Sequence, residues 1–387
     1  MIAYSNYSGD ARIRREAEVL ASTEEYEVTV LTLKNSRVKN SRMNGGVLLR
    51  ELGTSKYRGS SLFRYLLSYL KFMFEAFRVC NRMLWKRKVW AFHVHNIPNF
   101  LIFSALGARI TGRRVILDIH DSVPETYSAK FTNTPGGFLF KLLCLEEAFC
   151  CKLADRVICV NHPQRDALVR RGIDPGKIAV SMNVPDPRIF SALPGGGSNG
   201  SGTGRFRLVY HGTLAKRLGI DLAIRAVAKL ADAIPGIEFH VLGDGDDKRD
   251  FVELAKDLGV DRVVHFREAV PLEELRGILG GMDLGVVSNR RNMATELMLP
   301  AKLMEYVALG IPVVAPRLRT IEHYFASDMV GYFEPGDVDS MAGAVLALYR
   351  DPARREVHVQ RARAFLDEYG WAKHQQGLLD LYRRLYV

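Results

Sequence analysis

The sequence is poor in the features that mark several protein classes. It has only five cysteines, an odd number without the spacing of metal ligands, so we expect reduced thiols and no disulfide framework or zinc module. No apolar run is long enough to span a bilayer, and the N-terminus lacks the apolar core of a signal peptide. A G-x-G-x-x-G dinucleotide fingerprint is also missing from the first loop. The lack of a membrane-spanning run and of a signal peptide predicts a cytoplasmic protein, and the missing fingerprint argues against a dinucleotide site in the first loop.

What is present suffices for two ordinary domains. The chain has 387 residues, and 48% of them are hydrophobic. The stretch from Pro194 to Gly204 is rich in glycine and serine, a composition typical of a flexible linker. We therefore predict a first domain at residues 1–190, a linker at 191–204, a second domain at 205–370 and a last amphipathic helix at 371–387.

Positive charge is concentrated in the first half of the chain. The net charge is +11, of which residues 1–190 carry about +12 and the remainder about −1. Nucleic acid, an anionic membrane face and a phosphate-bearing lipid are all possible partners for such a surface. Residues 62–90 combine aromatic side chains with cations. That pattern is typical either of a helix in a membrane interface or of a packing helix whose aromatic stripe is core.

The most informative stretch runs from Thr295 to Pro316. An apolar run before it, Asp283 to Ser288, and its own end, Val313 to Ala315, have the character of buried parallel strands. Between them we expect one short helix. Pro300 suits the first helical position, and the Gly-Ile-Pro sequence after Leu309 is a stop signal.

Lys302 is unusual because it places a cation in the first turn of this helix, where the helix dipole repels positive charge. A helix N-terminus with a lysine is suited to hold a phosphate. Glu305 lies on the same side, and its carboxylate can accept two hydrogen bonds from the hydroxyls of a ribose. The alternative is a surface ion pair between these two residues.

Residues 299–312 read Leu-Pro-Ala-Lys-Leu-Met-Glu-Tyr-Val-Ala-Leu-Gly-Ile-Pro, with a Pro-x-Lys-Leu-x-Glu-Tyr core at 300–306. This segment resembles the donor-binding segment of family 4 of the retaining glycosyltransferases. The resemblance implies an α/β protein of the GT-B fold, in which two doubly wound Rossmann-like domains face each other across a cleft. The acceptor would bind residues 1–190 and the nucleotide sugar residues 205–370. The helix at 371–387 would pack back on the first domain.

The family's donor loop corresponds to residues 212–221. This chain departs from it, because Thr213 replaces an arginine and Leu218 stands where a lysine is expected; Lys216 and Arg217 are near enough to supply the charge. We expect the nucleotide sugar to contact Gly212, Thr213, Lys216, Arg217, Lys302, Leu303 and Glu305. We expect catalytic roles for His120, Lys302, Arg217 and Glu305, with Arg217 standing in for the family's missing cation.

The acceptor side rests on two further likenesses. The pattern Asp10-x-Arg12-x-x-Arg-Glu-Ala resembles the family's first loop and helix, and His120-Asp121-x-x-Pro-Glu125 resembles its sugar-facing loop. We expect His120 to approach the transferred sugar. Asp10, Arg12, Asp121 and Glu125 are the candidate acceptor contacts. In the family, two paired glutamates of the donor segment are separated by seven residues, whereas Glu296 and Glu305 here are separated by eight. Glu296 or Thr295 therefore takes the role of the first glutamate, or that role is empty.

The predicted reaction is transfer of a hexosyl group from a UDP- or GDP-linked sugar to an acceptor hydroxyl with retention, without cofactor or metal. The acceptor is expected to be lipid-linked or a glycan, in surface polysaccharide or glycolipid assembly at the inner membrane face. Asp244-x-Asp246 follows a glycine turn, so we interpret it as a solvated turn and not as a metal site. Two alternatives stay open: a nucleotide-sugar epimerase of the same fold, and a basic nucleic-acid-binding protein, although recognisable nucleic-acid motifs are absent.

Overall fold

The computed structural model describes residues 1–34, 45–57, 59, 61–86, 89–131, 137–191 and 204–386, so most of the predicted linker lies outside the described residues. The chain divides into two compact units. Unit 1 comprises Met1–Asn183 and Gln375–Val387, and unit 2 comprises Val184–His374. The first division falls seven residues before the end predicted for the first domain, and the second falls four residues inside the predicted last helix.

Unit 1 alternates strands and helices, as a doubly wound fold requires. Its elements are η1 (Tyr7–Gly9), α1 (Ala11–Ala21), β1 (Thr29–Thr32), β2 (Leu48–Glu51), α2 (Leu62–Trp85), β3 (Ala91–His95), η2 (Asn99–Ala105), α3 (Leu106–Ile110), β4 (Arg114–Ile119), α4 (Val123–Phe131), α5 (Phe138–Leu153), β5 (Arg156–Cys159), α6 (His162–Arg170), η3 (Pro175–Lys177) and β6 (Ile178–Val180).

The strands of unit 1 form a parallel sheet around a single residue, Ile2. Strands β3, β4, β5 and β6 pair in that order, and β1 pairs with β2. Ile2 bridges the two groups, because it pairs with Leu31 of β1 and Val94 of β3. The chain therefore crosses from one half of the sheet to the other beside Ile2, and such a switch point is where open α/β sheets bind ligands.

Unit 2 repeats this plan with a longer sheet. Its elements are β7 (Phe206–His211), η4 (Lys216–Leu218), α7 (Ile220–Leu230), β8 (Ile237–Leu242), α8 (Lys248–Asp257), β9 (Val264–Arg267), α9 (Leu272–Leu279), β10 (Leu284–Val286), α10 (Met293–Glu296), α11 (Ala301–Leu309), β11 (Val313–Pro316), α12 (Arg319–Tyr324), β12 (Gly331–Phe333), α13 (Val338–Arg350), α14 (Pro352–Tyr369) and the start of α15 (Trp371–Tyr386), which belongs to unit 1 from Gln375 on.

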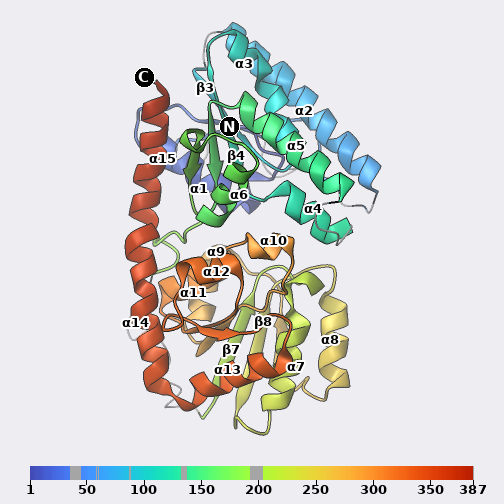
Figure 1. The fold of residues 1–387 in the computed structure, drawn as a ribbon, viewed down its shortest axis with the longest axis vertical. Coiled ribbons are helices and arrows are strands. Elements are labelled where there is room, and N and C mark those ends of the chain that lie inside the picture. The colour runs from blue at the N-terminus through green and yellow to red at the C-terminus, as the bar shows by residue number, and fades with distance from the viewer. Residues whose placement is uncertain are drawn as a thin grey trace. The chain divides into compact units, whose positions relative to one another are not determined.

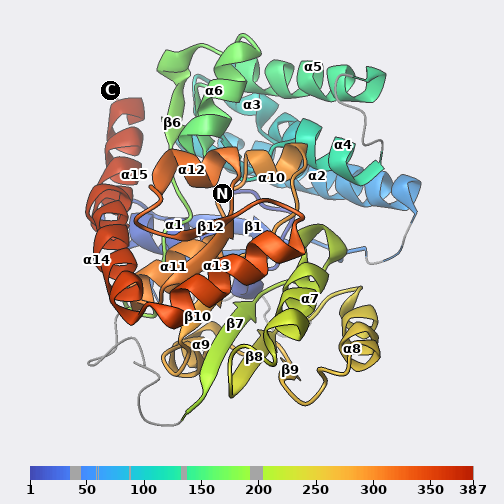
Figure 2. The same ribbon diagram turned by 60° about the horizontal axis from the view of Figure 1, so that its bottom comes forward.

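The sheet of unit 2 is parallel throughout, with the order β12-β11-β10-β7-β8-β9. Its switch point lies between β7 and β10, and α7 and α13 pack side by side along the sheet (Figure 1 and Figure 2). The predicted α/β class with two doubly wound sheets is confirmed. Both faces of such a sheet are covered, which explains why the central residues of β7, Leu208 to Tyr210, are all buried.

The segment between β10 and β11 contains two helices where the sequence predicted one. Asn292 caps the short α10, and Pro300 lies just before α11 as its N-cap, so the helix begins at Ala301. The stop signal was correct, because Gly310 ends α11 in a left-handed conformation with φ of 75°. Tyr306 of α11 packs against β10: a Cβ at Gly285 would lie 2.5 Å from its ring. This glycine lets α11 approach the sheet closely.

The core interpretation of residues 62–90 holds for one face of α2, and the membrane interpretation stays a prediction for the other face. Phe72, Ala76 and Cys80 are buried in the core of unit 1, whereas Phe63, Phe74 and other apolar side chains are exposed. Among the helices that the structure describes, none has both the length and the apolar character needed to cross a bilayer.

Candidate active site

At the switch point of unit 2, Lys302 lies against the end of β7. Its Nζ stands 3.7 Å from the centre of the Tyr210 ring, a cation–π contact, and the side chain is half-buried. Burial lowers the pKa of Lys302 to about 7, and the charge of Glu305 only partly opposes this shift. Within the described residues, no carboxylate lies within ion-pair distance of this ammonium.

Glu305 is held from the strand side. Its Oε2 lies 2.6 Å from Nε2 of His211, the last residue of β7, whose Nδ1 lies 3.0 Å from the Tyr306 hydroxyl. That hydroxyl donates to the carbonyl of Val209. Oε1 of Glu305 makes no hydrogen bond to any described residue, so one edge of the carboxylate stays available.

The loop after β7 passes directly over Lys302. Gly212 has a φ of 116°, and a Cβ at this position would lie 3.7 Å from Cε and Nζ of Lys302. The next residue, Thr213, is exposed, and its carbonyl accepts a hydrogen bond from the Tyr210 hydroxyl. The loop closes against the end of β10, because Ser288 Oγ donates to the carbonyl of Leu218. The left-handed Gly219 permits this contact, since a Cβ there would lie 2.0 Å from the Ser288 carbonyl.

The two basic residues of this loop differ in their surroundings. The Lys216 ammonium lies 2.5 Å from Asp250 and is largely exposed. Arg217 has no carboxylate partner in the described parts of the chain. Burial raises the pKa of Tyr210, and the charge of Arg217 partly opposes this rise. Arg217 therefore lies near the same tyrosine as Lys302, whereas Lys216 is committed to an ion pair. Leu303, also predicted here, is fully buried core.

Both candidates for the first position of the glutamate pair are engaged locally. Oε2 of Glu296 accepts from the backbone N–H of Arg319 at the start of α12, and Oε1 pairs with Arg291. Thr295 is buried, and its hydroxyl closes the capping box of α10 with Asn292. These contacts explain both side chains without a ligand.

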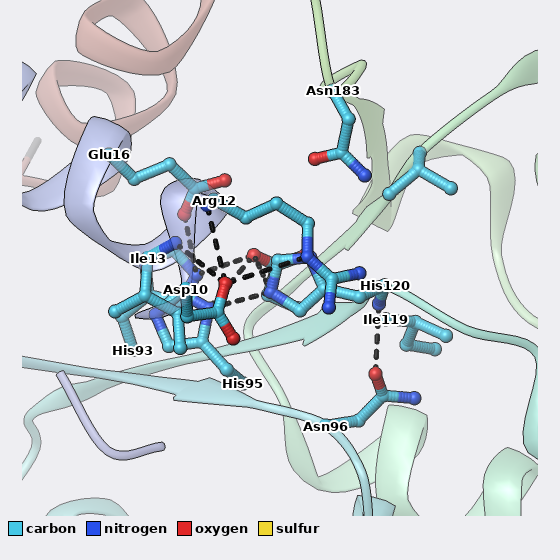
Figure 3. Close-up of polar contacts among 12 residues, drawn as sticks. Asp10, Arg12, Ile13, Glu16, His93, His95, Asn96, Ile119, His120 and Asn183 are labelled. Atoms are coloured by element: carbon cyan, nitrogen blue, oxygen red, sulfur yellow. Dashed lines mark hydrogen bonds and ion pairs between the residues drawn. The ribbon is translucent and has the colours of Figure 1, made fainter. Parts of the chain in front are cut away.

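In unit 1, His120 lies in a cluster of buried polar groups at the ends of β3 and β4 (Figure 3). Its backbone N–H donates to Oδ1 of Asn96, and its Nε2 lies 3.2 Å from Oδ2 of Asp118 and 2.9 Å from Nδ1 of His95. Burial lowers the pKa of His120 to about 3, although the Asp118 charge opposes this shift.

Three of the four predicted acceptor contacts come together. Asp10 caps α1 by accepting from two backbone N–H groups, and its Oδ1 lies 3.6 Å from Nε of Arg12. Arg12 also reaches Asp121 at 4.0 Å. Glu125 is separate from this group, because its carboxylate pairs with Arg171 and accepts from the Ser122 hydroxyl.

Sequence reasoning missed Tyr210, His211 and Tyr306 as parts of the donor-side group. A signal existed for the first two, because they end a buried parallel strand, where ligands of α/β sheets gather. The role of Tyr306 depends on Gly285, which is distant in sequence and visible only once β10 and α11 pack together.

Two protein-family models match the chain. Residues 10–183 match a glycosyl transferase 4-like domain, and residues 205–351 match the glycosyl transferases group 1 domain. Among curated proteins, the chain is similar to the GPI3 subunit of phosphatidylinositol N-acetylglucosaminyltransferase from Saccharomyces cerevisiae. The two are 24% identical over 337 residues, which cover 81% of this chain and 72% of that subunit.

Solved structures share the fold. Sucrose-phosphate synthase from Thermosynechococcus elongatus superposes with a TM-score of 0.81 at 16% identity, over 100% of this chain and 98% of the other. HepE from Anabaena, in complex with UDP-glucose, superposes with a TM-score of 0.73 at 15% identity, over 99% and 98%. Together with the two doubly wound sheets, these likenesses identify the fold as GT-B, as predicted.

Proposed function

The chain belongs to the family-4 type of GT-B glycosyltransferases, and from that premise we propose that it transfers a hexosyl group from a nucleotide diphosphate sugar to an acceptor hydroxyl, with retention of anomeric configuration. Lys302 carries this proposal. A half-buried cation that lacks a carboxylate partner within the described residues is costly in the free protein. A bound anion explains why the fold places it at the N-terminus of α11, beside Gly212.

The chemistry follows from where this charge stands. When the glycosidic bond breaks, negative charge develops on the leaving diphosphate, and fixed positive groups aimed at it stabilise the transition state more than the ground state. Lys302, Arg217 and the N-terminus of α11 supply that field. The transfer then requires neither metal nor cofactor, and the leaving phosphate itself can help deprotonate the acceptor hydroxyl on the same face.

Glu305 would bind the ribose of the donor. Its Oε2 is fixed by His211, which orients the carboxylate, while Oε1 is available to accept a hydroxyl hydrogen bond. A carboxylate held in this way does not have to be ordered when the ligand arrives, which reduces the entropic cost of binding. HepE's complex with UDP-glucose supports a UDP-linked donor, with a GDP-linked sugar as the other candidate.

Unit 1 would bind the acceptor. Asp10, Arg12 and Asp121 form one polar group, and His120 would approach the transferred sugar. The yeast relative is named for a phosphatidylinositol substrate, which supports a lipid-linked acceptor in glycolipid or surface polysaccharide assembly. A soluble glycan is the alternative.

A lipid-linked acceptor would require contact with a membrane, and unit 1 has a suitable surface, which we call the α2/α5 face. Helices α2 and α5 both pack on η2 and point apolar side chains to solvent. Its exposed apolar residues are Phe63, Leu66, Leu67, Phe74, Phe77, Trp85, Phe138, Leu139, Leu142, Leu145 and Phe149. Cations on the same helices, such as Lys71, Arg78 and Lys141, complement anionic headgroups. This surface supports peripheral binding of the enzyme to a membrane, and we propose that it binds the cytoplasmic face.

Lys302→Met tests the proposed function. Loss of one transition-state charge should reduce turnover by about 10² to 10³, measured as sugar transfer or donor hydrolysis with the UDP- or GDP-sugar that a thermal-shift screen selects. Lys229→Met is the matched control, because Lys229 is an exposed lysine of unit 2 paired with Asp339. Equal rates for Lys302→Met and the wild type would contradict the assignment. An isomerised sugar formed from donor alone would instead indicate an epimerase.

A further inference from the structure

A second group of potential ligands lies in unit 1 and has no part in the donor site. It consists of Glu16 on α1, His93 and His95 on β3, and Asp118 on β4. One ligating atom from each of the four lies within 4.8 Å of the others, and every one of these side chains is at least 97% buried. The spacing rules that detect metal sites in sequence could not reveal this group, because the fold assembles it from three elements.

The atoms are arranged as the ligands of a small cation would be. Asp118 Oδ2 lies 3.3 Å from Nε2 of His93 and 3.1 Å from Nδ1 of His95. Glu16 Oε2 lies 3.7 Å from Nε2 of His93. In a tetrahedral site with bonds of about 2.0 to 2.1 Å, neighbouring ligand atoms stand about 3.3 to 3.4 Å apart. Three of the six ligand pairs therefore lie near the separation of a tetrahedral site, and all of them lie within 4.8 Å, so a short inward movement of the side chains would enclose an ion. Figure 3 shows Glu16, His93 and His95 close to one another.

The cluster also contains unmet hydrogen-bonding capacity. Oε2 of Glu16 and Oδ1 of Asp118 are buried without a hydrogen-bond partner. Two carboxylates in one dry site repel each other and lose their hydration, and such groups are ordinarily paired or bound to metal. The two carboxyl groups lie close enough to share a proton, and a divalent cation would take the place of that proton and compensate the burial of both groups.

The surroundings orient one imidazole toward the centre. Tyr382, from the end of α15, lies with its hydroxyl 2.7 Å from Nδ1 of His93. When Nδ1 carries the proton and donates to that hydroxyl, Nε2 presents its lone pair inward, which is the arrangement found behind metal-bound histidines. His120 Nε2 stands beside the group, 2.9 Å from Nδ1 of His95, and does not belong to the four.

We propose that Glu16, His93, His95 and Asp118 form a binding site for a divalent transition-metal ion, with Zn²⁺ as the best match. Two imidazoles and two carboxylates suit Zn²⁺ in four-coordinate geometry. The ion would tie α1 to β3 and β4 and thereby stabilise unit 1. This goes beyond the transfer reaction, because the donor phosphates are assigned to unit 2 and need no metal.

The test uses the full chain stripped with a chelator and then titrated with Co²⁺, whose visible absorption reports tetrahedral coordination, and with Zn²⁺ by calorimetry. We expect one equivalent to bind, the intense Co²⁺ bands to appear, and Zn²⁺ to raise the unfolding temperature. Tyr382→Phe should weaken binding by about 10- to 100-fold, as loss of a group that orients a ligand does.

Asp118→Asn and Glu16→Gln should each abolish the Co²⁺ bands. His240→Gln is the matched control, because His240 forms a histidine–carboxylate pair with Glu238 in unit 2 that lacks further ligands among the described residues. If Asp118→Asn does not fold, the Co²⁺ spectrum of Glu16→Gln and the number of metal ions bound per wild-type chain still test the proposal. A wild-type protein that binds no Co²⁺, even when refolded with the metal, would show a purely hydrogen-bonded cluster and overturn the proposal. So would an unchanged spectrum in both ligand variants.

Discussion

Lys302 gains its significance from what surrounds it. An exposed lysine is usually fully charged and contributes little to stability. This one is half-buried against Tyr210, and Glu305 is the nearby negative charge that raises its pKa against the effect of burial. Its sequence position, in the first turn of a helix, already indicated an anion site. The depth of burial and the aromatic contact came only from the fold, because Tyr210 lies on a strand about ninety residues earlier.

The lowered pKa of Lys302 predicts proton uptake on donor binding. The free protein has a pKa of about 7 at this residue, whereas a bound diphosphate would return it toward the ordinary value of about 10.4. Between these values the complex binds a proton that the free protein lacks, so affinity for UDP or GDP should fall as the pH rises above about 7. Calorimetry at pH 8.5 in buffers of different ionisation enthalpy measures the uptake.

Lys302→Met provides the comparison for this experiment. The variant should bind more weakly and take up no proton. Equal uptake in the variant and the wild type would assign the titration to another group and would remove Lys302 from the phosphate site.

At the scale of elements, sequence patterns predicted the fold class and the helix that carries Lys302 and Glu305 well. Strands that are buried on both faces are continuous apolar runs in the sequence. A glycine such as Gly310 is typical of a helix end, because it adopts the left-handed conformation found there. Both features can therefore be predicted from the local sequence. The same patterns were not used to predict α10, although its capping box between Asn292 and Thr295 is a local feature. The contact of Glu296 with Arg319 of α12 joins residues 23 apart and could not be predicted locally. Nor could local patterns show Glu125 paired with Arg171, since that pair joins segments 46 residues apart.

The α2/α5 face makes a prediction of its own. Because its apolar side chains and cations suit an anionic interface, the protein should sediment with vesicles containing phosphatidylglycerol at low salt and should not bind phosphatidylcholine vesicles. Phe74→Ser combined with Leu145→Ser should weaken this binding while leaving the unfolding temperature nearly unchanged, since both side chains are exposed.

Val357→Ser is the control for that surface, because Val357 is an exposed apolar residue of α14 in unit 2. Two outcomes would argue against the α2/α5 face as a membrane contact. One is loss of vesicle binding in the control as well as in the double variant, and the other is equal binding to charged and uncharged vesicles.

At the scale of the whole molecule, charge and proposed function are distributed differently. The first half of the chain carries about +12 and the second about −1. If net charge alone decided where a phosphate binds, the donor would bind unit 1. We propose that the donor binds unit 2 instead, because the half-buried Lys302, a helix N-terminus and a left-handed glycine converge there at the β7–β10 switch point.

The most direct test of this claim is amide hydrogen exchange of the full chain with and without saturating UDP or GDP. We predict slower exchange at residues 212–219 and in the first turn of α11, and no such protection in Lys302→Met. Protection confined to residues of unit 1, with α11 and the loop after β7 unchanged, would contradict the assignment of the donor to unit 2.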